Sequence, residues 1–104
     1  MAQFDVYGNP NEETNAMTPY LLNVQADILD NLSTRVVVPL LSQTTMGKPI
    51  DRLNPRFTIE GDTVFMSTPE LAGVPTDVLG KKIASLNERR DDIMAALDFL
   101  FLGF

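Results

Sequence analysis

The residue types that most often carry catalysis in small proteins are missing from this chain, which contains no cysteine and no histidine. Their absence removes the thiolate and imidazole ligands of zinc and the commonest general base at neutral pH. We therefore expect no metal, no cofactor and no Cys or His nucleophile. A base and a cation beside a scissile phosphate could still come from four charged residues: Asp27, Arg35, Arg56 and Glu60. Because charges on half-buried sheets normally face water, we expect these four to be solvated strand and loop charges.

The segment Phe99–Phe104 carries the strongest chemical signal, although the signal is for binding. It reads Phe-Leu-Phe-Leu-Gly-Phe, and successive helical residues step by about 100° around the axis, so these side chains point in every direction. One helix face can pack on a sheet, which leaves Phe101, Leu102 and Phe104 as an apolar patch of the kind that marks an interface.

This apolar patch could be covered in three ways. Gly103 could stop the helix in a left-handed conformation and let Phe104 fold back onto Phe99. Two copies of the chain could place these ends together near a two-fold axis. A different protein could dock there, with aromatic side chains as the main anchors. The second and third covers are compatible with each other.

A helix over about residues 87–102 positions this segment. Asn87 can serve as its N-cap, and Asp91 and Asp92 favour the positive end of the helix dipole. A helical stripe follows, made of Ile93, Ala96, Leu97 and Leu100. Because this stripe has the spacing of a buried helix face, we expect it to pack on a sheet.

Strands should occupy most of residues 3–80. The expected strands or apolar segments are 3–7, 20–24, 35–41, 56–60 and 63–67. The last two flank Gly61-Asp62 and predict a β-hairpin whose turn suits type II′. Pro39 lacks an N–H group, so we expect it at an edge, a bulge or the last pairing position. Residues 42–54 predict a surface loop, and residues 69–80 an irregular segment with one short strand around Val78.

Composition limits the class of protein. The chain has 104 residues with 44% hydrophobic and 21% charged residues, which is typical of one folded domain. Its net charge of −6 disfavours direct nucleic-acid binding and favours a protein partner. No segment approaches the roughly 20 apolar residues of a membrane span, and Met1–Asp5 lacks the features of a secretory signal. We therefore expect a cytoplasmic protein without membrane contact.

Several segments, taken in order, resemble the CcdB family of toxins over nearly the whole chain. The matching segments are Gln3–Tyr7, Val24–Asp30, Arg35–Leu40, Val74-Pro75 with Leu79-Gly80, and Arg89–Asp98. Each match alone is weak, and their order and spacing make the combination specific. The resemblance implies a single domain over residues 1–104, mainly β with a C-terminal α-helix, built as an SH3-like barrel of twisted antiparallel strands.

The resemblance also implies a function. A CcdB-like chain forms a homodimer that binds the A subunit of DNA gyrase, traps gyrase on cleaved DNA and is neutralised by a cognate antitoxin. Such a protein poisons gyrase by binding and needs no catalytic residue. The residues that match the gyrase-contacting positions of the family are Ile28, Leu29, Asp98, Phe101, Leu102, Gly103 and Phe104. Well-known members end in Trp-Gly-Ile, where this chain has Leu102-Gly103-Phe104.

Other interpretations stay open beside this one. Ile28 and Leu29 can be core or dimer-packing residues, because such side chains are usually buried. An endoribonuclease of the MazF type shares the expected barrel, and a fold does not fix a function. A relative that has lost gyrase poisoning is the third possibility.

Overall fold

The computed structural model describes residues 1–104, which form an antiparallel sheet and a C-terminal helix. The strands are β1 (Asp5–Gly8), β2 (Tyr20–Asn23), β3 (Thr34–Ser42), β4 (Arg56–Ile59), β5 (Asp62–Met66), β6 (Ala72–Pro75) and β7 (Lys82–Ser85). The α-helices are α1 (Gln43–Met46) and α2 (Arg90–Leu102), and the 3₁₀ helices are η1 (Asp27–Leu29), η2 (Thr68–Glu70), η3 (Thr76–Val78) and η4 (Asn87–Arg89). No helix is both long and apolar enough to span a bilayer.

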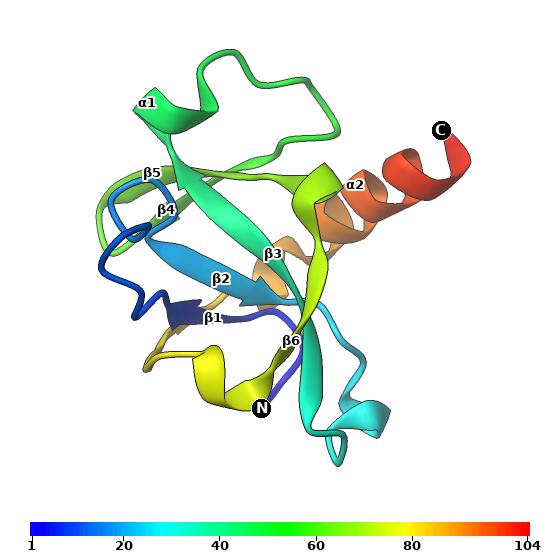
Figure 1. The fold of residues 1–104 in the computed structure, drawn as a ribbon. Coiled ribbons are helices and arrows are strands. Elements are labelled where there is room, and N and C mark those ends of the chain that lie inside the picture. The colour runs from blue at the N-terminus through cyan, green and yellow to red at the C-terminus, as the bar shows by residue number, and fades with distance from the viewer.

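The sheet curls into a half-barrel, which confirms the predicted fold class (Figure 1). Its strand order is β4-β5-β3-β2-β1-β7, and β6 pairs with β3 off this path. The curl centres on the nine-residue strand β3, which changes partner along one edge. Residues 34–37 pair with β6, and residues 40–42 pair with β5.

Pro39 lies in the middle of β3, opposite Leu21. On the other side of β3 it has a local edge, as expected, because pairing with β6 ends at Val37 and pairing with β5 begins at Leu40. The Pro39 carbonyl oxygen accepts a hydrogen bond from the Ser67 N–H at 2.9 Å. This side of β3 faces the gap between β6 and β5, where neither strand pairs with Pro39, so the missing N–H of proline breaks no ladder hydrogen bond. The proline therefore fits the point at which the strand changes neighbours.

The core lies between the curled sheet and the first half of α2. Strand β4 shows the reason, because its residues alternate, with Phe57 and Ile59 buried and Arg56 and Thr58 exposed. The core cluster consists of Phe4, Val6, Tyr20, Leu22, Val38, Leu40, Phe57, Ile59, Val64, Met66, Leu86, Ile93 and Ala96. The last two anchor α2 to the sheet.

The predicted β-hairpin is present, but its turn is one residue earlier than expected. Ile59 pairs with Asp62, so Glu60 and Gly61 form the two-residue loop. Both have positive φ, 50° and 84°, which is the pattern of a type I′ turn and not of type II′. Gly61 adopts this conformation at little cost, whereas Glu60 carries a Cβ atom in the left-handed region.

The later half of the chain departs furthest from expectation. The strand predicted around Val78 is wrong, since Val78 ends the 3₁₀ helix η3 and the strand of this region is β6. Strand β7 was not predicted. The loop over residues 42–54 begins with the short helix α1, whose N-cap Ser42 accepts a hydrogen bond from the Thr45 N–H. The opening strand starts at Asp5, because Phe4 has a φ of 72° and turns the chain there.

Candidate functional site

The last turn of α2 carries its largest side chains into solvent. Phe101 is 69% exposed, Leu102 60% and Phe104 76%. Ile93 and Ala96, nearer the start of the same helix, are fully buried, so the helix is fixed at its start and uncovered at its end. Figure 1 shows this end pointing away from the sheet. We call Asp98, Phe101, Leu102, Gly103 and Phe104 the helix-end surface.

The start and middle of α2 differ from the sequence prediction in two ways. Asn87 does not cap the helix, because it begins η4, and neither η4 nor α2 has a side-chain N-cap hydrogen bond. Leu97 is partly buried against the core as expected, but Leu100 is only half-buried and lies outside the core cluster. The buried stripe is therefore shorter than the predicted one, because the sheet ends before the helix does.

Gly103 ends the helix in the way that was expected for Phe104 to fold back onto Phe99. It has the left-handed conformation, with φ 80° and ψ 10°, and its N–H donates to the Phe99 carbonyl oxygen at 3.0 Å. The accompanying contact is absent, because Phe104 remains 76% exposed and does not cover the patch by folding back. The helix stop therefore presents Phe104 to solvent.

Two further features belong to the helix-end surface and its border. Phe99 is half-buried, and the Arg52 guanidinium carbon lies 4.8 Å from the centroid of its ring. Asp98 is exposed, and its position along the helix places it on the same face as Met94 and Leu102. The helix-end surface thus combines apolar anchors with one carboxylate.

Ile28 and Leu29 lie in η1 and form part of a second exposed apolar region. Ile28 is 88% exposed, Leu29 45%, and the nearby Leu32 47%. The alternative that these side chains pack in the core of this chain is therefore wrong. We call Ile28, Leu29 and Leu32 the loop surface.

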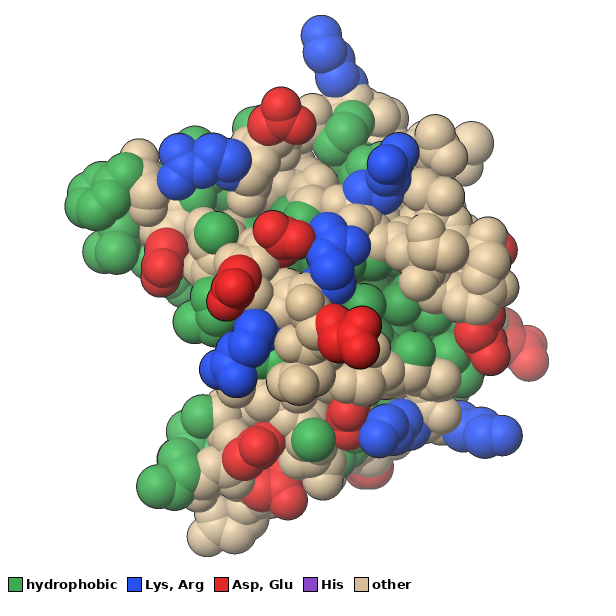
Figure 2. Space-filling view, turned by 180° about the vertical axis from the view of Figure 1, so that it is seen from behind, with side chains coloured by type: hydrophobic (Ala, Val, Ile, Leu, Met, Phe, Trp, Pro, Cys, Tyr) green, Lys and Arg blue, Asp and Glu red, His purple; other side chains and the backbone are tan.

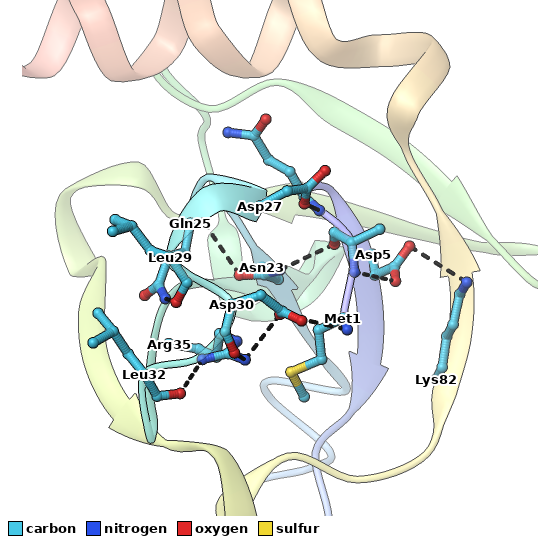
Figure 3. A network of polar contacts seen from close by, with 12 residues as sticks. Met1, Asp5, Asn23, Gln25, Asp27, Leu29, Asp30, Leu32, Arg35 and Lys82 are labelled. Carbon is cyan, nitrogen blue, oxygen red and sulfur yellow. Dashed lines mark hydrogen bonds and ion pairs between the residues drawn. The ribbon is translucent and has the colours of Figure 1, made fainter.

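A polar network, drawn in Figure 3, holds the loop surface in place. The Gln25 side-chain amide donates to the Leu29 carbonyl oxygen at 3.0 Å, and Asp27 accepts from the Gln3 N–H at 2.6 Å. The guanidinium group of Arg35 donates to the carbonyl oxygens of Asp30, Leu32 and Thr34. The network therefore ties the segment after η1 to the start of β3.

The helix-end surface and the loop surface do not form one patch within the chain. In Figure 1 the red end of α2 and the cyan η1 segment lie far apart on the same side of the molecule. Figure 2 shows hydrophobic side chains at both places, with the outline hollowed between them. Of the seven predicted contact residues, the structure groups the five at the end of α2 and just after it, and it leaves Ile28 and Leu29 apart.

The four charged residues considered for phosphate chemistry are not assembled into a site. Arg35 is only 5% exposed, so the expectation that it faces water is wrong, and loop carbonyls occupy its guanidinium group. Glu60 lies in the β4–β5 turn, whereas Arg56 begins β4 at the far end of the hairpin. Asp27 lies in η1, and no group of three or more acidic side chains is placed to hold a metal ion.

Comparison with protein families identifies the family of the chain. The chain matches the family model described as CcdB protein over residues 3–103. This chain belongs to the CcdB family. Members of the CcdB family are toxins of toxin–antitoxin modules, and they act by binding protein and not by catalysis. The exposed side chains of a CcdB-family toxin are therefore the first candidates for contact with a partner protein.

Sequence reasoning missed two charged features of this CcdB-family chain. One is the burial of Arg35, whose only signal was its position at the start of a β-branched run. The other is a recess lined by Arg52, Arg56 and Arg89 beside α2. No sequence signal joins these three arginines, because only the hairpin and the helix together bring them to one place.

Proposed function

We propose that this CcdB-family toxin binds the A subunit of DNA gyrase through its helix-end surface and traps gyrase on cleaved DNA. The observation that carries the proposal is the exposure of Phe101, Leu102 and Phe104 at the end of a helix whose start is buried. A rigid projection with aromatic anchors suits protein docking, since large aromatic side chains contribute most of the binding energy at interfaces. Asp98 adds a charge that can pair with a basic group on the target.

The loop surface takes part in the same proposal through Ile28 and Leu29. A target that contacts both surfaces of one chain must bridge the hollow between them (Figure 2). Alternatively, a homodimer brings the loop surface of one copy beside the helix-end surface of the other.

We propose that a cognate antitoxin neutralises the toxin at the same surface. A cognate antitoxin that covers the helix-end surface denies gyrase its anchors, and the toxin needs no chemical change to become inactive. Gyrase acts on cellular DNA, so the proposed place of action is the cytoplasm.

The test is gyrase-dependent cleavage of supercoiled plasmid in the presence of ATP, followed by detergent and protease. We expect the protein to produce linear DNA and a variant lacking Leu102–Phe104 to produce none. Ile50→Ala is a matched control, because Ile50 is also an exposed apolar residue, at 57%, but lies in the loop after α1. Circular dichroism checks that both variants keep the fold.

Two results would contradict the proposal. Absence of linear DNA with the intact protein at micromolar concentration excludes gyrase poisoning. Cleavage activity in the truncated variant excludes the helix-end surface as the contact. Incubation with a defined RNA in parallel separates the remaining alternative, because the gyrase proposal expects the RNA to stay intact.

A further inference from the structure

Three arginines converge on one recess of a protein whose net charge is −6. The recess lies between β4 and α2 and has a volume of about 490 Å³. Arg52, Arg56 and Arg89 line it, and Asp92 is the only acidic residue among its lining residues. The recess is thus basic, whereas the rest of the chain has more acidic than basic residues.

Strand alternation and helix spacing explain the convergence. In β4 the side chains of Phe57 and Ile59 point to the core, which turns Arg56 and Thr58 to the opposite face, toward the recess. Arg89 ends η4 and Asp92 lies three residues later in the first turn of α2, a spacing that places them on the same side of a helix. Ordinary secondary structure therefore builds both walls.

Two of the guanidinium groups are held by aromatic rings. The Cζ atom of Arg89 lies 4.7 Å from the centroid of Phe57, and its Nε donates to Asp92 at 2.9 Å. Arg52 stacks on Phe99 with a separation of 4.8 Å. Stacking uses the face of a guanidinium group, so the N–H edge of Arg52 stays free to bind a carboxylate in bidentate geometry, whereas Arg89 already uses its Nε–H for Asp92.

The charges of Arg52 and Arg56 are not neutralised within the chain, because neither forms an ion pair. Arg52 also holds a φ of 70°, a conformation that a residue with a Cβ atom rarely adopts. Strained positions of this kind are concentrated at ligand clamps. Unpaired and partly immobilised arginines are prepared to receive an anion.

The recess continues past the arginines into a second hollow. Arg52, Pro55 and Arg56 line both, and the second is also lined by Pro49, Asp51, Asn54 and Phe65. The two hollows therefore combine guanidinium groups with proline and aromatic surface. An extended peptide has side chains that alternate in direction, so it can offer carboxylates to the arginines and apolar side chains to the proline and aromatic surface.

We propose that this arginine recess binds an acidic peptide segment of a partner protein, with carboxylates on Arg52 and Arg56. A nucleic acid suits the groove less, because its continuous phosphate backbone brings a charge with every nucleotide to a chain of net charge −6, whereas a peptide can bring single carboxylates to Arg52 and Arg56. The proposal is independent of gyrase binding, since no residue of the helix-end surface lines the recess.

The experiment uses the full chain and a short fluorescein-labelled peptide in which Glu alternates with Leu, followed by fluorescence anisotropy. We expect saturable binding that Arg56→Glu weakens at least about tenfold, because a charge-assisted pair is replaced by repulsion. Lys81→Glu is the matched control, since it changes the net charge equally but lies outside the recess, and it should change affinity by about twofold or less. Arg56→Lys should retain part of the affinity, because it keeps the charge and loses the bidentate edge.

Three results would overturn the proposal. The first is no binding of the Glu peptide beyond that of a peptide with Gln in place of Glu. The second is equal weakening by Arg56→Glu and Lys81→Glu, which would indicate a general charge effect. The third is tighter binding of a single-stranded RNA of the same length than of the peptide, which would assign the groove to phosphate.

Discussion

The guanidinium group of Arg35 lies 2.9 Å from the carboxylate of Asp30, although Arg35 is almost fully buried and Asp30 is about half exposed. The N-terminal amino group of Met1 lies 3.5 Å from the same carboxylate (Figure 3). One acidic side chain thus joins the start of the chain, the segment after η1 and the start of β3. The loop surface is shaped by this junction.

Arg35→Ala should destabilise the protein by about 3 kcal/mol, because it leaves three loop carbonyl oxygens without their buried donor. Asp30→Asn should cost about 1 kcal/mol or less, since solvent screens the half-exposed carboxylate. Urea denaturation measures both changes. Arg56→Ala is the control for loss of an exposed arginine. An Arg35→Ala variant as stable as this control would contradict the stabilising role of the Arg35 hydrogen bonds.

Glu60→Asn should stabilise the protein by about 0.5–1 kcal/mol. Glu60 occupies the first central position of a type I′ turn with a φ of 50°, where Asn followed by Gly is the preferred pair. Thermal or urea denaturation provides the measurement. Glu60→Ala removes the same charge but gains no left-handed preference, so an equal effect of the two variants would assign the gain to charge and not to the turn.

Sequence patterns predicted the elements whose signal is local. The β4–β5 hairpin follows from alternation on either side of a turn, and α2 from its apolar periodicity. Strands β6 and β7 are four residues each, and β6 contains Gly73 and Pro75, so neither carries a recognisable period. These strands form because β6 pairs with β3 and β7 pairs with β1, and both pairings join residues that are distant in the chain.

The same distinction holds for the candidate site. The exposure of Phe101, Leu102 and Phe104 could be predicted, because consecutive large apolar residues exceed what one helix face can bury. The separation of Ile28 and Leu29 from them could not, since it depends on the curl of the sheet. Their shared part in gyrase binding stays a prediction.

Stability should fall above about pH 10 through the two tyrosines. Burial raises the pKa of Tyr20 above its ordinary value of 10.0, and the hydrogen bond to Asp62 adds to the rise. Tyr7 is raised in the same direction, by burial first and then by Asp5. The unfolded state therefore loses its tyrosine protons first, so this stabilisation is complete below about pH 10 and is lost as pH rises through the folded pKa.

Tyr20→Phe should reduce the slope of unfolding free energy against pH between about pH 9 and 11, and Tyr7→Phe with Tyr20→Phe should reduce it further. Urea denaturation at several pH values gives the slope. At neutral pH, Tyr20→Phe alone should cost about 1 kcal/mol for the lost hydrogen bond. An unchanged slope in the double variant would show that other groups cause the alkaline loss.

Leu102→Trp should strengthen gyrase binding. Leu102 stands where well-known CcdB-family members carry tryptophan, and it is 60% exposed, so a larger ring meets no obstacle in the core. A tryptophan face can stack on a guanidinium group of the target and leucine cannot, a difference of about 0.5–2 kcal/mol. This corresponds to roughly 2- to 30-fold in affinity, measured by titrating the gyrase A subunit. Ile50→Trp adds the same ring to an exposed position away from α2, and a gain as large in that variant would show that the ring acts without the helix-end surface. A Leu102→Trp variant that binds no tighter would place Leu102 outside the gyrase contact.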